Sequence, residues 1–197
     1  MTQYERLEQL VSANHGIVQT AEAVAAGISK PAFYKFIKDR DLEQVSHGVY
    51  ASPDAWTDTM YLLSLRCKQA LFSHETALFL HDLTDREPTQ YSITVKTGYN
   101  PSKLKADGIK VYTVKKEFYG IGMAKMQTPF GHTVRAYNPE RTVCDIIRSR
   151  SNIEMQTFQD ALKQYAKRKE KNLRLLMQYA QEFHVEKILN RYLEALL

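Results

Sequence analysis

"AAGISKPAFYKFIKDR", residues 25–40, decides the fold expected for the N-terminal part of this 197-residue chain. Gly27 is placed to end one short helix, and Ser29 is placed to cap the next one. Pro31 falls in the first turn of that next helix, where its missing N–H costs no hydrogen bond. The stretch therefore predicts two helices joined by a short turn that contains a glycine.

The second of these helices is predicted to have two contrasting faces. Its apolar face carries Phe33, Phe36 and Ile37. Its opposite face carries Lys30, Tyr34, Lys35 and Lys38, and residues 28–38 include no acidic side chain. A basic face without carboxylates suits a polyanion, although the lysines of an ordinary solvated helix give the same pattern. The surrounding elements have to distinguish the two interpretations.

The flanking segments favour a DNA-binding arrangement. Residues 4–14 show helical spacing that Gly16 ends, and Thr20 is a candidate cap for a short helix over residues 21–26. "LEQVSHGVYAS", residues 42–52, has two short extended runs around Gly48 and predicts a hairpin. Helix, short helix, turn, helix and hairpin is the order of a winged helix-turn-helix, whose third helix enters the major groove of DNA.

This arrangement gives a set of candidate DNA-binding residues. They are Ser29, Lys30, Tyr34, Lys35, Lys38, Arg40 and His47. The lysines would contact phosphates, Tyr34 would reach a base edge or a phosphate, and His47 would lie at the tip of the wing. No arginine or asparagine stands on the exposed face, so bidentate reading of bases is not predicted. The alternative is that the same fold serves as a protein-interaction module and sequesters a partner protein directly.

The composition is that of a water-soluble globular protein, with 44% hydrophobic and 25% charged residues. No apolar run is long enough for a membrane span, and the polar N-terminus does not resemble a signal peptide, so we expect a cytoplasmic protein. Two distant cysteines, Cys67 and Cys144, fit a reducing compartment. The net charge of +5 favours acidic partners, but residues 1–55 carry −2 and residues 56–197 carry +7.

A boundary is predicted at Pro53, which separates a winged helix-turn-helix domain (1–53) from a second domain (54–197). The second domain is expected to be mixed, which makes the whole chain α+β. "YSITVKT" (91–97) and "IKVYTV" (109–114) predict strands, and residues 123–137 predict a hairpin that turns at 129–131. Pro139 is expected to open a helix, and helices follow to the C-terminus. Ser73 is a candidate cap of a helix before the sheet.

A basic stretch in the second domain explains part of its charge. It comprises Lys163, Lys167, Arg168, Lys169, Lys171 and Arg174, against the single acid Glu170. A solvated surface accounts for these residues. A second part of a DNA footprint, or a surface that recognises a nucleic-acid substrate, accounts for them equally.

Enzyme motifs are matched only in fragments. "GIGMAK" (120–125) lacks the third glycine of a dinucleotide fingerprint, and "SKLK" (102–105) with "KTG" (96–98) stands in the wrong order for a penicillin-binding pattern. "SHETALFLH" (73–81) has no second histidine one turn after His74. We therefore predict no catalytic residues, no metal site and no cofactor.

Over its whole length the chain resembles a known family, the AbiEi-type antitoxins of type IV toxin–antitoxin systems. Besides the N-terminal segment through "HGVYASPD", the resemblance is carried by "FSHETALFLHDLTDREPTQYSITV", "RAYNPERTVCDIIRSR" and "FQDALKQYAKRKEKNLRLLMQYAQEF". It implies a bacterial abortive-infection (phage-defence) protein that binds inverted repeats in its own promoter and represses transcription. It also implies a C-terminal domain that counteracts a co-encoded nucleotidyltransferase-type toxin without forming a stable complex.

The resemblance also bears on individual residues and on assembly. It identifies Glu140, Arg141, Asp145 and Arg148 as family-motif positions. Arg141 and Asp145 are one helical turn apart and can pair, and we expect a structural role for them rather than a catalytic one. Many relatives have an arginine where this chain has His47. The implied assembly is a monomer in solution that pairs on double-stranded DNA, with no membrane partner.

Overall fold

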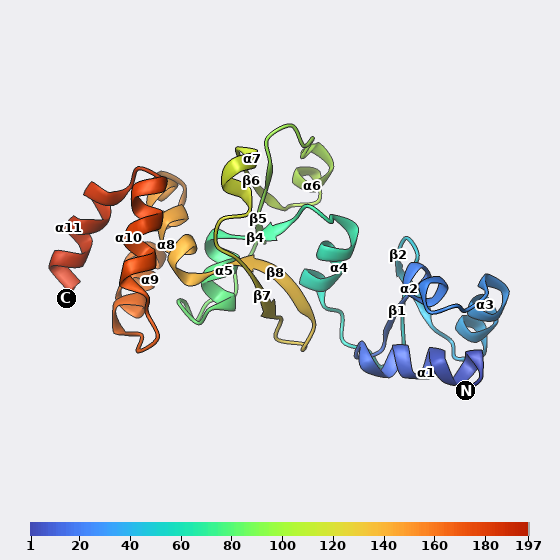
Figure 1. Ribbon diagram of the computed structural model, residues 1–197. Coiled ribbons are helices and arrows are strands. Elements are labelled where there is room, and N and C mark those ends of the chain that lie inside the picture. Colours follow the sequence, from blue (N-terminus) through green and yellow to red (C-terminus); the bar gives the residue numbers. More distant parts are fainter. Residues whose placement is uncertain (197) are drawn as a thin grey trace. The chain divides into compact units, whose positions relative to one another are not determined.

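The computed structural model describes the backbone of residues 1–196 and the side chains of residues 1–194 (Figure 1). It has two compact units: residues 1–68 with 127–133, and residues 69–126 with 134–197. The predicted α+β class is confirmed. Among the described residues, none of the helices is both long and apolar enough to cross a membrane. The domain boundary at Pro53 stays a prediction.

The first unit contains the predicted helices and hairpin. Its elements are α1 (Gln3–Ala13), β1 (Ile17–Gln19), α2 (Thr20–Ala25), α3 (Lys30–Asp39), β2 (Glu43–Ser46), β3 (Val49–Ala51) and α4 (Thr59–Arg66). Strand β3 lies between β1 and β2 and is antiparallel to both. The sequence analysis did not predict β1, because a strand of three residues is too short to show alternation.

The turn between α2 and α3 forms for the reasons that the sequence suggested. Gly27 adopts a φ of +79°, in the left-handed region that glycine enters without strain. The Ser29 hydroxyl accepts a hydrogen bond from the Ala32 N–H at 3.4 Å, which caps α3. The prediction that Thr20 caps α2 was wrong. Thr20 is the first helical residue, and its buried hydroxyl has no hydrogen-bond partner among the described residues.

One apolar cluster holds the first unit together. Its buried members are Leu7, Val18, Ala23, Ile28, Phe33, Phe36, Ile37 and Leu42. The predicted apolar face of α3 thus faces α1, α2 and the small sheet. Because one face of α3 packs into this cluster, its opposite face lies on the surface.

The second unit is built on a mixed sheet. Its elements begin with β4 (Leu71–Phe72), α5 (His74–Leu80), β5 (Ser92–Lys96), α6 (Ser102–Ala106), β6 (Lys110–Val114), α7 (Lys116–Tyr119), β7 (Met123–Gln127) and β8 (Thr133–Tyr137). The strand order is β6-β5-β4-β8-β7, with β5 parallel to β6 and antiparallel to β4. The segment "SKLK" lies within α6.

Helices complete the second unit. They are α8 (Pro139–Arg148), a 3-10 turn (Arg150–Asn152), α9 (Met155–Lys167), α10 (Leu173–Glu182) and α11 (Glu186–Leu196). Helix α8 packs against α5 and also contacts α9, α10 and α11 (Figure 1). Residues 140–147 of α8 are all buried. Its polar side chains therefore need partners inside the protein.

Candidate nucleic-acid interface

The exposed face of α3 carries the predicted cations without any compensating acid. Lys30, Lys35 and Lys38 are exposed, and none of them forms an ion pair within the described part of the chain. Tyr34 lies on the same face with half of its surface (50%) exposed. Because Lys30, Tyr34 and Lys38 are spaced four residues apart, they project from one side of the helix. The side chains predicted to contact DNA on α3 are thus brought together.

Aromatic contacts fix this face relative to the unit. The Tyr34 ring meets Phe33 edge to face at 5.4 Å and Tyr50 of β3 at 6.4 Å between ring centroids. On the other side of α3, the Phe36 ring packs against Tyr4 of α1 at 4.8 Å. Tyr34 is therefore anchored at its ring while half of its surface faces solvent.

Two of the predicted DNA-binding residues have partners inside the unit. The Arg40 guanidinium is paired with Glu8 and lies 5.6 Å from the Tyr4 ring centroid, so Arg40 links α3 to α1. Ser29 donates its N–H and its hydroxyl to Gln3 Oε1, both at 3.3 Å, and its hydroxyl also caps α3. These two residues shape the ends of α3, whereas the lysines remain available.

The hairpin of β2 and β3 places His47 at its tip. Gly48 has a φ of +68°, as a tight turn requires, and the register shifts between Gln44 and Ser46. His47 is exposed. The hairpin stands where the sequence predicts a wing, but its exposed Glu43 gives its base a negative charge.

A groove next to α3 adds two basic residues that the sequence analysis missed. It measures about 720 Å³, and its lining includes Lys30, His47, Arg66 and Lys68. Arg66 and Lys68 come from the end of α4 and the segment after it, far along the chain from α3. Only the folded unit brings them to the same groove, so no local pattern could have identified them.

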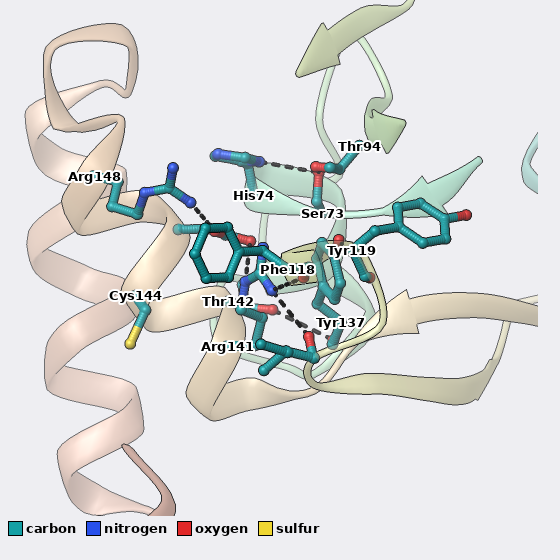
Figure 2. Close-up of polar contacts among 12 residues, drawn as sticks. Ser73, His74, Thr94, Phe118, Tyr119, Tyr137, Arg141, Thr142, Cys144 and Arg148 are labelled. Atoms are coloured by element: carbon teal, nitrogen blue, oxygen red, sulfur yellow. Dashed lines mark hydrogen bonds and ion pairs between the residues drawn. The ribbon is translucent and has the colours of Figure 1, made fainter. Parts of the chain in front are cut away.

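The family-motif residues of the second unit are mostly buried, and Figure 2 shows the polar contacts of Arg141. Arg141 Nε donates to Asp145 Oδ2 at 3.0 Å, and Nη1 donates to the carbonyls of Phe118 and Ile121, each at 2.9 Å. The predicted Arg141–Asp145 pair is thus present. Glu140 Oε1 accepts from the Tyr165 hydroxyl and from the Asn172 N–H, both at 3.1 Å.

The loop that follows α7 is shaped to receive Arg141. Gly122 has a φ of +76°, and a Cβ on it would lie 2.6 Å from the Arg141 Cβ. The guanidinium also lies 4.1 Å from the Tyr137 ring centroid and 4.0 Å from that of Phe183. Gly122 of "GIGMAK" therefore permits close packing against Arg141.

The basic stretch of residues 163–174 is divided between two roles. Arg168 donates to the His81 carbonyl and so links the end of α9 to the end of α5, and Lys171 donates to the Arg168 carbonyl at 3.1 Å within the segment between α9 and α10. The exposed members are Lys163, Lys167, Lys169 and Arg174. These four cations form the part of the stretch that can meet a charged partner.

Comparisons with known proteins bear on the N-terminal unit. Residues 5–53 match a family described as "Transcriptional regulator, AbiEi antitoxin". No curated protein matches the chain. Among solved structures, the chain is similar to the RV2827C protein from Mycobacterium tuberculosis at 13% identity and a TM-score of 0.47. That similarity covers 98% of this chain and 81% of the other. The similarity to a family of transcriptional regulators is thus confined to residues 5–53, the segment that contains the capped α3 and its exposed lysines.

Proposed function

We propose that this protein is a DNA-binding autorepressor in which α3 enters the major groove of inverted repeats in its own promoter. One observation carries the proposal: three exposed lysines without acidic partners share a face of α3, within the segment that matches a family of transcriptional regulators. Residues 1–53 form the DNA-binding domain, and residues 54–197 form the antitoxin domain. The protein is a monomer in solution and pairs on the repeats.

The contacts with DNA are mainly contacts with phosphates. Lys35 and Lys38 neutralise backbone charges, and Lys30, at the start of α3, lies on the groove that also includes Arg66 and Lys68. Tyr34 reaches a base edge or a phosphate, and His47 at the hairpin tip contacts the backbone or the minor groove. Electrostatic attraction supplies most of the affinity, so binding falls steeply with salt.

The second domain acts on a toxin. We infer that it counteracts a co-encoded toxin of the nucleotidyltransferase type without forming a stable complex. The exposed cations among residues 163–174 extend the DNA footprint or recognise the nucleic-acid substrate of that toxin. This part of the proposal rests on the family resemblance. The proposed location is the bacterial cytoplasm, in a type IV system that acts in phage defence.

A charge reversal on α3 tests the DNA-binding role. Lys35→Glu with Lys38→Glu should abolish binding to the promoter fragment in fluorescence anisotropy, because two attractions to phosphates become repulsions. Both side chains are exposed, so the fold should survive. The matched control is Lys103→Glu with Lys105→Glu on α6, which changes the net charge equally in the other unit. Equal affinity of the two double variants would remove α3 from the interface.

Two further measurements separate this proposal from direct sequestration of a protein. The slope of log affinity against log salt should lie at about −4 to −6, if roughly five to seven phosphates are neutralised. Size-exclusion chromatography of the protein with the product of the neighbouring gene should give two separate peaks. A co-eluting complex together with a flat salt response would favour the protein-interaction module instead.

A further inference from the structure

A small polar cleft in the second unit is unused by the proposed function. It has a volume of about 140 Å³. Its lining includes His74, Thr94, Tyr112, Arg141, Asp145, Arg148 and Ser149. The last four come from α8 and the residue after it, and Thr94 and Tyr112 come from the neighbouring strands β5 and β6. Residues from three distant parts of the chain thus meet in one cleft.

The charges of the cleft leave one cation in excess. Asp145 is already neutralised by Arg141, whose Nε lies 3.0 Å from Oδ2. Arg148 approaches Asp145 Oδ1 only at 3.4 Å, and its side chain is 39% exposed. The carbonyl end of α8 contributes roughly half a negative charge, which the full charge of Arg148 exceeds. The planar guanidinium of Arg148 therefore keeps most of its donors for another acceptor.

A chain of hydrogen bonds orients a second donor, the Ser149 hydroxyl, toward the cleft. The Thr94 hydroxyl donates to Ser73 Oγ at 2.8 Å, and Ser73 Oγ lies 3.0 Å from His74 Nδ1 (Figure 2). In the tautomer whose Nδ1 accepts the Ser73 proton, the neutral ring donates from Nε2 to Ser149 Oγ at 3.1 Å. The Ser149 hydroxyl proton then remains available to an acceptor in the cleft.

The backbone of His74 is strained at the position from which its ring contacts Ser149. Its φ is +49°, in the left-handed region that a residue with a side chain rarely adopts, and its ring stacks on Tyr112 at 3.5 Å between centroids. Burial lowers the pKa of His74 well below its usual value, and the charges of Lys110, Arg141 and Arg148 lower it further. The ring is therefore neutral at pH 7, and an observed backbone outlier of this kind is often associated with function.

We propose that the cleft at the end of α8 binds the phosphoryl group of a small phosphate monoester. Arg148 provides a forked guanidinium that matches two phosphoryl oxygens, and Ser149 donates a third hydrogen bond. His74 is a positioning residue, because it acts through Ser149. Since drug-sized ligands need clefts of about 300 Å³ or more, the cleft accepts the phosphoryl group while the rest of the molecule stays outside.

Calorimetric titration of the full-length protein in a buffer free of phosphate tests this site. The probes are inorganic phosphate, AMP and adenosine. Phosphate and AMP should bind and adenosine should not, because adenosine lacks the phosphoryl group. Equal affinity for phosphate and AMP identifies free phosphate as the ligand, and tighter binding of AMP identifies a monoester.

Variants locate the site. Arg148→Gln should weaken the binding of phosphate or AMP roughly tenfold to a hundredfold, as expected for the loss of a charged hydrogen-bond donor. Arg148→Lys, which keeps the charge but loses the fork, should lie between Arg148→Gln and the wild type. The matched control is Arg191→Gln, since Arg191 is an exposed residue of α11 outside the cleft. His74→Gln should weaken phosphate binding, and His74→Gln combined with Ser149→Ala should weaken it no further than Ser149→Ala alone.

Three outcomes would overturn the proposal. The first is that the wild-type protein binds neither phosphate nor AMP at millimolar concentration. The second is that Arg148→Gln and Arg191→Gln bind phosphate equally well. The third is that Arg148→Gln weakens only the binding of promoter DNA, which would assign the cleft to the DNA footprint. Promoter binding should instead be unchanged in Arg148→Gln, so this proposal and the proposed repressor role fail independently.

Discussion

Helices α3 and α8 are both ten residues long, and the lysines of α3 and Arg141 of α8 are placed in opposite ways. On α3 the lysines are exposed and have no acidic partner in the described part of the chain. On α8 Arg141 is fully buried, and hydrogen bonds and ring contacts hold it. Replacing an exposed cation should change binding and spare the fold, whereas replacing a buried one should do the reverse.

The largest effect should come from Arg141→Leu. This variant leaves Asp145 Oδ2 and the carbonyls of Phe118 and Ile121 without their donor. Loss of one partner of a buried ion pair costs about 3–5 kcal/mol in the free energy of unfolding. Urea denaturation followed by circular dichroism measures it. The control is Arg148→Leu, which removes a partly exposed cation from the same helix and should cost about 1 kcal/mol or less. If both variants lost the same free energy of unfolding, the buried Arg141 would be no more important for stability than the partly exposed Arg148.

The contrast between the two helices was only partly predictable from the sequence. The apolar spacing of Phe33, Phe36 and Ile37, together with Ser29 and Pro31, is local information, and it predicted both the start and the exposed face of α3. The pairing of Arg141 with Asp145 was predictable for the same reason, since one helical turn separates them.

The remaining contacts depend on residues that are distant along the chain. Ser149 meets the His74 ring across 75 positions, and Arg141 reaches the Phe118 carbonyl across 23. Arg66 and Lys68 join Lys30 at one groove only after α4 has packed. No periodicity or cap signals such contacts, because they are set by the tertiary fold.

The next largest effect is a loss of stability as the pH is lowered. Burial, the largest cause, lowers the pKa of His74 and of His81, so the folded protein keeps both neutral while the unfolded chain protonates them below about pH 6.5. Because the unfolded state then binds more protons, stability falls as the pH drops below that value. Each histidine contributes at most about 1.4 kcal/mol per pH unit.

His74→Gln tests this assignment by removing one of the two protonation steps. Urea denaturation between pH 7.5 and 5.5 should give a shallower loss of stability for this variant than for the wild type. An unchanged slope in His74→Gln would show that this ring binds its proton as readily in the folded protein as in the unfolded chain, against the assignment.

A smaller effect is expected at the N-terminal end of α3. Ser29→Ala removes the hydroxyl that accepts from the Ala32 N–H and should cost about 1 kcal/mol of stability. Ser29→Asp should restore the cap, because a carboxylate accepts the same bond, but it places a negative charge near the proposed DNA. Stability should therefore recover while promoter affinity falls in fluorescence anisotropy. Loss of stability in Ser29→Asp as well would mean that the contact with Gln3, rather than the cap, is decisive.

The smallest effect on stability should come from Lys35→Ala. This variant tests most directly whether an exposed cation of α3 contributes to binding without contributing to the fold. Lys35 is exposed and has no ion-pair partner among the described residues, so the free energy of unfolding should change by no more than about 0.5 kcal/mol. Its promoter affinity should still fall, and the salt slope should become shallower by about one, because one phosphate contact is lost. Lys103→Ala on α6 serves as the control and should alter neither quantity. A slope that stays at the wild-type value would mean that Lys35 faces solvent in the complex, and α3 would then contact DNA through a different edge.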